Sequence, residues 1–324
     1  MTKLTRRTVV AGLAALPALT HSARSDDAYP QRPVKVIVPF SAGGVTDVAA
    51  RLWSQRVSER LGKQFVIENQ GGGGANIGIG SASRATPDGY TLLMAASAFA
   101  INPSLYNKIP YDPNGFEPVT MLGVTPNVLF VHPSIPATTL AEFLKLIQDN
   151  PGKYAVASSG IGTPVYLQGE LLKFRYKLEL TPVPFAGGSQ AVQAVVGGHV
   201  PVAMTTLTSI PPLVETGKLR ALAVTGAERS VLLPKVPTFK ELGLADLEAG
   251  TWVGLLAPGG TPKPIVTKLY EATKAFLAED SATDRLRQIS VEPKHLTPPQ
   301  FAEQLQKEAA EWSNIIKLAK LERV

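Results

Sequence analysis

The sequence predicts an α/β fold made of two units, each with a mostly parallel β-sheet. Three observations support this prediction. The chain has 324 residues, which corresponds to two domains at about 150 residues each. Hydrophobic residues make up 44% of it, enough for a sizeable core. Short β-branched runs alternate with helical patterns along the chain, and this order favours parallel strands joined by right-handed crossovers.

The first unit follows a β-α-β-α-β order. Residues 34–39 form a β-branched run after Pro33, typical of a buried strand. The pair Gly43-Gly44 then leads into a helical pattern over 45–61. The remaining elements expected here are strands at 64–68, 90–96 and 119–124, and a helix at 77–85.

The second unit repeats the alternation. Its first helix is expected over 138–150, with Thr138 or Thr139 as the cap and Pro151-Gly152 as the stop. The other expected elements are strands at 127–132, 154–157, 178–183, 200–205 and 219–225, and helices at 164–174, 189–196 and 211–216.

A last segment carries one more strand, at 248–257, and then helices at 264–278, 281–289 and 298–321. It could form a third unit or return to complete the first, and the residue pattern alone favours neither. A return would create two crossings between lobes and therefore a hinge.

The N-terminus has the layout of an export signal. Lys3, Arg6 and Arg7 precede an apolar run over 9–19, which is too short to span a bilayer. Residues 1–23 are therefore predicted to be a signal peptide of an exported, periplasmic protein. The export route remains open between the general secretory pathway and the twin-arginine pathway, which the Arg6-Arg7 pair would suit.

Composition excludes several classes of protein. There is no cysteine, so disulfides, thiolate nucleophiles and Cys-ligated metals are excluded. The four His are scattered along the chain, so no metal site is expected. The net charge of +6 falls to +3 without the three basic residues of the signal. The rest shows no Lys/Arg stripe of the kind that nucleic acid needs, so no nucleic-acid partner is expected.

Three Gly-rich loops carry the chemistry of the predicted site. They are centred on Gly43-Gly44, on residues 158–163 and on Gly187-Gly188, and each leads from a strand into a helix. Helix N-termini have unpaired N–H groups and partial positive charge, so they bind anions. The loops are nearly free of Lys and Arg, which favours a small carboxylate over a phosphate-rich ligand. Turn chemistry alone would also explain each loop singly.

Enzyme motifs are missing. The sequence contains no G-x-x-x-x-G-K-[ST] and no G-x-S-x-G, and the run Gly71 to Gly74 does not complete G-x-G-x-x-G because Ile77 stands at the last position. No catalytic residue is therefore predicted.

A series of motifs resembles the Bug receptors, the extracytoplasmic solute-binding proteins of tripartite tricarboxylate transporters. The resemblance covers nearly the whole mature chain in order. The motifs are Pro39-Phe40-x-Ala-Gly-Gly-x-x-Asp47-x-x-Ala50-Arg51, Glu68-Asn69, Gly73 to Gly78, Pro87 to Leu92, Asn102 to Tyr106, Gly169-Glu170-Leu171, Gly217 to Thr225, Pro237-Thr238-Phe239, Trp252-Val253-Gly254 and Ala257 to Pro262.

The resemblance implies a two-lobed Venus-flytrap fold with the ligand cleft between the lobes. It implies lobe 1 at 29–125 plus 249–324, and lobe 2 at 126–248. It also implies that two loops grip one ligand carboxylate, partly through water. These residues are Phe40, Ser41, Ala42, Gly43, Gly44, Asp47, Ser158, Ser159, Gly162 and Thr163. The distal end of the ligand is expected to face Ser97, Ala98, Phe99, Gly187, Gly188, Thr205 and Thr206.

Three candidate ligand-binding positions depart from the usual pattern of the family. Tyr166 stands where the family often has His, and Phe185-Ala186 where it often has Tyr-Lys. Thr205 stands where an acidic residue is common. The missing acid argues against an amino-acid ligand, and the missing Lys against a highly charged tricarboxylate.

The sequence therefore predicts a periplasmic receptor, not an enzyme, for a dicarboxylate or an aromatic acid. Its expected partners are this ligand and the permease subunits of a tripartite tricarboxylate transporter. We expect a monomer without a cofactor. Two alternatives remain: a binding protein that reports its ligand to the sensor kinase of a two-component system, and a periplasmic hydrolase or isomerase, which the scattered His oppose.

Overall fold

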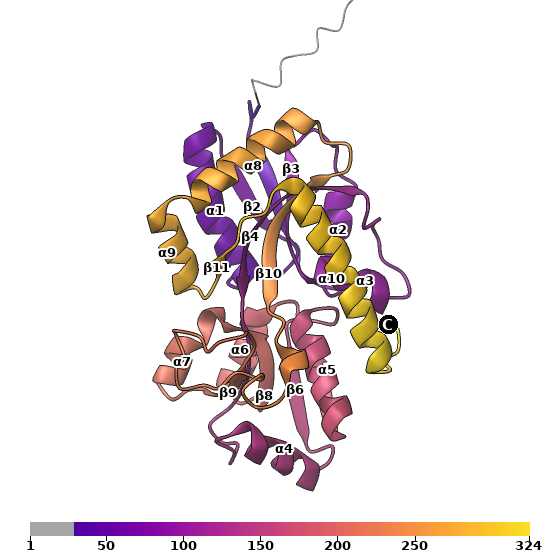
Figure 1. Cartoon of the computed structure of the whole chain (residues 1–324), viewed down its shortest axis with the longest axis vertical. Coiled ribbons are helices and arrows are strands. Elements are labelled where there is room, and N and C mark those ends of the chain that lie inside the picture. Colours follow the sequence, from indigo (N-terminus) through magenta and orange to yellow (C-terminus); the bar gives the residue numbers. More distant parts are fainter. Residues whose placement is uncertain (1–28) are drawn as a thin grey trace, which may run out of the picture.

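The computed structural model describes residues 29–324, and its two β-sheets form the cores of two lobes stacked along the long axis (Figure 1). One sheet has six strands in the order β11-β4-β10-β3-β1-β2, and the other has five in the order β7-β6-β8-β5-β9. The predicted two-lobed α/β fold is confirmed. The predicted signal peptide at 1–23 lies outside the described residues.

The first lobe begins with parallel strands, since β1 pairs in parallel with both β2 and β3. Strand β10 then runs antiparallel between β3 and β4, so the last part of the chain returns to this sheet. The elements of this lobe are β1 (Val34–Val38), α1 (Val45–Leu61), β2 (Phe65–Asn69), α2 (Asn76–Ser83), β3 (Thr91–Ala96), α3 (Ala98–Leu105), β4 (Phe116–Thr125), β10 (Thr251–Pro258), α8 (Lys263–Leu277), α9 (Asp280–Gln288), β11 (Glu292–Pro293) and α10 (Pro298–Leu318).

The second lobe has the same kind of mixed sheet. Strand β6 pairs in parallel with β7 and β8, and β5 runs antiparallel to β8 and β9. The elements of this lobe are β5 (Asn127–Val131), α4 (Leu140–Asp149), β6 (Tyr154–Ser158), α5 (Pro164–Tyr176), β7 (Leu180–Pro184), α6 (Gly188–Val196), β8 (Val202–Thr206), η2 (Leu207–Ser209), α7 (Pro211–Glu215), β9 (Arg220–Val224) and η3 (Ala245–Leu247).

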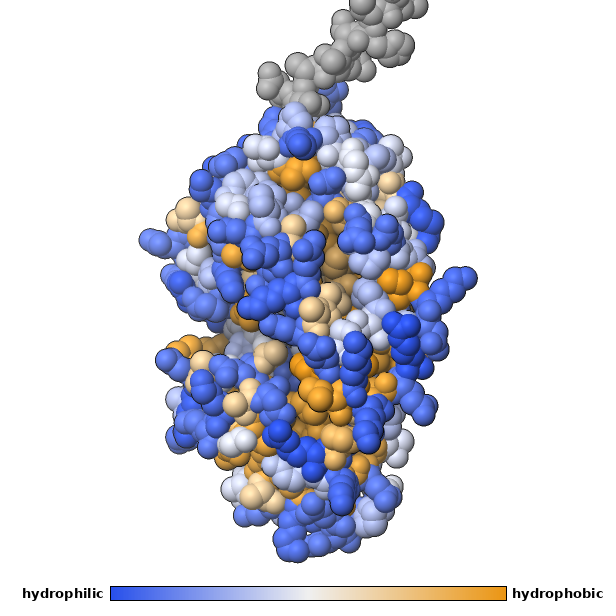
Figure 2. Space-filling model, turned by 45° about the vertical axis from the view of Figure 1, so that its right-hand side comes forward, coloured by the Kyte–Doolittle hydropathy of each residue, from blue (hydrophilic) through white to orange (hydrophobic). Residues whose placement is uncertain are grey.

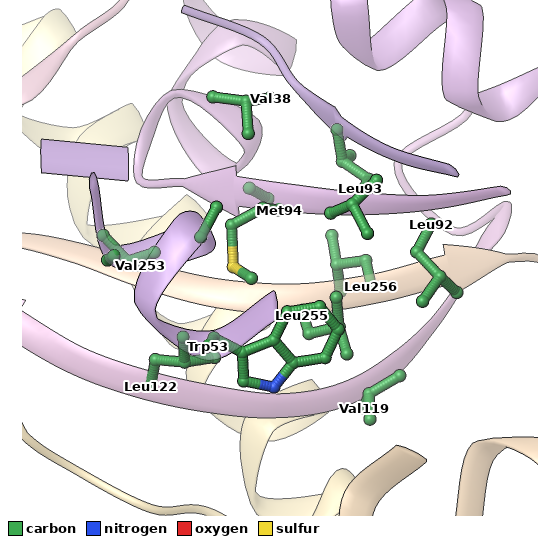
Figure 3. Close-up of a cluster of buried hydrophobic side chains, with 14 of the residues drawn as sticks. Val38, Trp53, Leu92, Leu93, Met94, Val119, Leu122, Val253, Leu255 and Leu256 are labelled. Carbon is green, nitrogen blue, oxygen red and sulfur yellow. The ribbon is translucent and has the colours of Figure 1, made fainter. Parts of the chain in front are cut away.

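The core of the first lobe packs α1 and α8 against the six-stranded sheet. Trp53 of α1 is fully buried among apolar side chains of the sheet strands (Figure 3). Its indole N–H donates to Thr273 Oγ1 of α8 at 2.9 Å, which satisfies the polar atom of this buried ring. Its ring meets Phe65 of β2 edge to face at 5.4 Å. One side chain thus joins two helices and a strand.

Both faces of the second sheet are covered. Phe143 of α4 and Leu172 of α5 belong to the apolar cluster on one face, and Val192 of α6 to that on the other. A smaller cluster crosses the lobe junction, where Leu167 of α5 is buried with Trp312 of α10. Figure 2 shows hydrophobic side chains gathered near this junction.

The chain crosses between the lobes twice. Only Pro126 separates β4 from β5, and the second crossing is the longer segment between β9 and β10. A buried hydrogen-bond network ties the two crossings together. Asn127 accepts a bond from Thr251 Oγ1 (2.8 Å) and donates to Gln168 Oε1 (2.9 Å), and Gln168 donates to the carbonyl of Ala249 (2.6 Å).

Helix α3 is not among the elements expected from the sequence. Pro103 within it has no N–H to donate to the Phe99 carbonyl, which accepts from Tyr111 Oη at 3.4 Å instead. Among the helices of residues 29–324, none is long and apolar enough to cross a membrane.

A cavity between the lobes as the candidate binding site

A cavity lies between the two lobes, and domain interfaces are a preferred location for small-molecule sites. Its wall combines apolar side chains with five hydroxyl groups. None of the described residues that line it is charged. They are Phe40, Gly44, Val45, Thr46, Ala96, Ala98, Ser159, Thr163, Pro164, Val165, Gly188, Thr206 and Thr251.

Four helices begin at this cavity. The first residues of α1 and α3 line it from the first lobe, and those of α5 and α6 line it from the second. The N-cap positions of α1, α3 and α6 make no side-chain capping bond, so backbone N–H groups at these ends keep their donor capacity. Helix α5 differs, because the Thr163 hydroxyl caps the Tyr166 N–H. The converging dipoles give the cavity a positive potential without any cationic side chain.

The hydroxyls of the cavity differ in what they offer a ligand. Thr251 donates its proton to Asn127 Oδ1 at 2.8 Å, and Thr163 donates to the Gly160 carbonyl at 2.6 Å. Both therefore offer only acceptor capacity to the cavity. Among the described residues, the hydroxyls of Thr46, Ser159 and Thr206 have no such partner, so they can donate to an anion.

Asp47 holds the first Gly-rich loop in place. Its carboxylate accepts bonds from the Gly43 N–H (2.9 Å), Arg51 Nε (3.1 Å) and Asn69 Nδ2 (2.9 Å). Asn69 also donates to the Phe40 carbonyl at 3.1 Å. Burial alone would raise the pKa of Asp47, but the bonds from Arg51, Gly43 and Asn69 outweigh it, so the pKa lies below its ordinary value. Asp47 thus fixes the conformation of this loop without lining the cavity itself.

The two lobes touch directly beside the cavity. The Ser41 N–H donates to the Ala186 carbonyl at 3.1 Å, and Ser189 Oγ donates to the Ala42 carbonyl at 2.8 Å. On a second contact, Tyr106 Oη donates to the Ile161 carbonyl at 3.0 Å. The structure is therefore a closed form in which both lobes enclose the cavity.

Seven of the predicted ligand-binding residues line the cavity. They are Phe40, Gly44, Ala98, Ser159, Thr163, Gly188 and Thr206. Ser41, Ala42 and Gly187 lie at the contact between the lobes instead. Their role toward a ligand remains a prediction.

Other predicted residues lie behind the wall or away from it. Ser97 and Ser158 are buried next to lining residues, and Thr205 donates to the backbone of Thr206. The Phe99 ring stacks on Tyr111 at 5.7 Å. The remaining positions are Gly43 beside Ser189, Gly162 against Asn102, Tyr166 in the apolar cluster at the lobe junction, and Phe185 against the core of the second lobe.

Six lining residues were not predicted. Val45, Thr46, Pro164 and Val165 follow the Gly-rich loops directly, so extending each loop by one helical turn would have included them. Ala96 and Thr251 come from β3 and β10. No local pattern marks Thr251, because only the pairing of β10 with β4 brings it to the cavity.

The fold and the cavity between the lobes are those of a two-lobed solute-binding protein. Three solved structures are similar over most of this chain. Periplasmic binding protein BugD is 33% identical, with a TM-score of 0.88 over 91% of this chain and 100% of that one. Rpa4515 of R. palustris with adipate is 34% identical, with a TM-score of 0.87 over 91% and 100%. MatC (Rpa3494) from Rhodopseudomonas palustris with bound malate is 33% identical, with a TM-score of 0.85 over 89% and 100%.

Residues 49–321 match the model of the tripartite tricarboxylate transporter family receptors. The chain belongs to this family, and the resemblance to the Bug receptors is confirmed.

Proposed function

We propose that this receptor binds a small dicarboxylate or aromatic acid in the cavity between its lobes and delivers it to the permease subunits of a tripartite tricarboxylate transporter. One observation carries the proposal: four helix N-termini meet at a cavity whose lining has no charged side chain. Backbone N–H groups and hydroxyls can hold a carboxylate there. The adipate and malate complexes of the two R. palustris relatives support this ligand class.

The chemistry of the lining argues against amino-acid ligands. An α-ammonium group taken into the cavity needs a carboxylate partner, because an unpaired buried cation is strongly destabilised. Neither Asp nor Glu lines the cavity, and Thr205 occupies the position where the family often has an acid.

The remaining parts of the proposal concern the whole chain. Residues 1–23 act as the export signal, and the mature protein acts as a monomer. Its lobes comprise 29–125 plus 249–324 and 126–248, with a hinge at Pro126 and Gly250. Binding is favoured in the closed form because both lobes then contribute helix N-termini to the same ligand.

Isothermal titration of adipate, malate, benzoate and aspartate tests the ligand class. We expect adipate, malate or benzoate to bind at least about 100-fold more tightly than aspartate, a difference of about 2.7 kcal/mol. Tighter binding of aspartate would contradict the proposal, and so would the absence of binding by every acid.

The variant Gly44→Val tests the location of the site. Gly44 has an extended backbone with φ −79°, and an added Cβ would approach only the Ser41 carbonyl, at 3.6 Å. The free protein should therefore keep its melting temperature while ligand binding is lost. Gly169→Val is the matched control, since a Cβ there meets nothing within 4 Å and Gly169 does not line the cavity. If the two variants bind the ligand with equal affinity, the loop that contains Gly43-Gly44 is not part of the site.

A further inference from the structure

Glu308 of α10 is a buried carboxyl group that the proposed function does not use. Among residues 29–324, Asp47 and Glu308 are the two buried carboxyl side chains. Asp47 is paired with Arg51. Glu308 is 7% exposed. It accepts hydrogen bonds from the indole N–H of Trp252 and, at 3.1 Å, from that of Trp312. The Ser97 hydroxyl also acts on this carboxyl group and favours its charged form.

These partners connect Glu308 to the wall of the cavity. Ser97 is the N-cap residue of α3, and its neighbours Ala96 and Ala98 both line the cavity. The backbone N–H of Trp252 donates to Ser97 Oγ at 3.2 Å. Thr251, next to Trp252, also lines the cavity. Glu308 therefore lies behind the cavity wall, next to the α3 N-terminus.

Few charged groups surround Glu308. Helix α3 and strand β10 carry no titratable side chain, while β4 carries Glu117, which accepts a bond from the Gly260 N–H. On α5, which meets α10 at the lobe junction, Lys173 pairs with Glu170. The other charged groups on these helices are Arg175 of α5 and Glu303, Lys307, Glu311 and Lys317 of α10.

Glu311, on the same helix, is a negatively charged neighbour of Glu308. Burial raises the pKa of Glu308 to about 7, because the bonds from Trp312, Trp252 and Ser97 only partly offset the loss of hydration. The group therefore titrates near neutral pH. Its charged form and a ligand carboxylate would both depend on the positive end of α3.

We propose that Glu308 is a positioning residue that couples ligand binding to proton uptake: when a dicarboxylate enters the cavity, the Glu308 carboxylate takes up one proton from the solvent. This inference rests on the proposed function. The new O–H bond removes the negative charge behind Ser97, so the α3 N-terminus faces only the ligand. The hydrogen bonds from the two indoles remain on the neutral acid, which keeps the wall in place.

Titration calorimetry with adipate, which is fully ionised above about pH 6.5, measures the coupling. In buffers of different ionisation enthalpy at pH 7, we expect uptake of about 0.4 proton per ligand for a pKa increase of one unit on binding. Over pH 6.5 to 8.5 the affinity should fall by roughly five- to tenfold. Heats that do not depend on the buffer would overturn the inference.

Two variants separate this role from a structural one. Glu308→Gln keeps one acceptor oxygen, which serves one of the two indoles, and cannot titrate. Its affinity should therefore be the same across this pH range. Glu311→Gln removes the neighbouring negative charge on the same helix, so it should keep a pH-dependent affinity whose midpoint lies at slightly lower pH than in the wild type. If the affinity of Glu308→Gln falls with pH as in the wild type, another group takes up the proton and the inference is refuted.

Tryptophan emission gives a readout without ligand. Trp252 and Trp312 both donate to Glu308, so the free protein should show an emission change centred near pH 7 that adipate moves to higher pH and that Glu308→Gln abolishes. A transition that adipate does not move would overturn the coupling. Failure of adipate and malate to bind at every pH would overturn the proposed function and this inference together, whereas binding without proton uptake overturns the inference alone.

Discussion

Closure of the lobes depends on a glycine at position 74, and Gly74→Ala should prevent it. A Cβ on Gly74 would lie 1.8 Å from the carbonyl oxygen of Ile161 in the other lobe and 2.5 Å from Tyr106 Oη. Real Cβ contacts stay above 3.0 Å, so the two segments must separate by at least about 1 Å. The residue has φ +60°, which adds about 1–2 kcal/mol of backbone strain for alanine.

The size of the effect follows from the contacts that closure makes. Three hydrogen bonds to backbone carbonyls join the lobes beside the cavity, from Ser41 N–H, Ser189 Oγ and Tyr106 Oη. At a net contribution of about 1 kcal/mol each, their loss amounts to about 3 kcal/mol. Since 1.4 kcal/mol is a factor of ten, we expect the affinity for adipate to fall about 100-fold.

Gly62→Ala provides the matched control. Gly62 also lies in the first lobe with a positive φ, +70°, but a Cβ there meets nothing within 4 Å. Both variants carry similar backbone strain, and only Gly74→Ala should lose affinity. Titration calorimetry measures the binding, and small-angle scattering should show that adipate compacts Gly62→Ala but not Gly74→Ala. Affinities within twofold of each other would refute the role of Gly74.

Three further predictions concern stability, each measured by chemical or thermal unfolding. Asp47→Ala should lower the free energy of unfolding by about 2–3 kcal/mol at pH 7, since it removes charged hydrogen bonds. The pKa of Asp47 is lowered, so this loss should shrink as the pH falls below about 4, and a constant loss would contradict it. Glu308 has a raised pKa of about 7, so wild-type stability should decrease as the pH rises from about 4.5 through 7. Glu308→Gln should lack this decrease, and a wild-type decrease in the variant would argue against a titrating Glu308. Asn127→Ala should lower the free energy of unfolding by about 2–4 kcal/mol, because Thr251 and Gln168 lose a buried partner, and a loss below 1 kcal/mol would show that the network contributes little.

Local patterns predicted most of the fold. The strand expected at 34–39 is β1 (Val34–Val38), and the helix expected at 45–61 is α1, because β-branched runs and helical spacing are set by neighbouring residues. The place of β10 between β3 and β4 could not be derived in this way, since it depends on pairing across more than a hundred residues. Only the family resemblance anticipated the return.

The same distinction between local patterns and long-range packing applies to the candidate site. The Gly-rich loops lead to the cavity because parallel strands place their carboxyl ends at one edge of a sheet. The orientation of a side chain within those segments depends on packing, as the stacking of Phe99 on Tyr111 illustrates. Thr251 lines the cavity and Glu308 lies behind its wall, and both come from segments far along the chain, so local sequence patterns could not reveal them.

The uncharged lining of the cavity has a consequence for release. A ligand held by arginine or lysine would have to break an ion pair before it could leave. Here the attraction comes from helix N-termini, two in each lobe. When the lobes separate, the ligand therefore loses the contribution of one lobe, about half of the favourable electrostatic potential. Binding and release then differ in the distance between the lobes. The opening motion that exposes the ligand to solvent also weakens its electrostatic attraction to the protein.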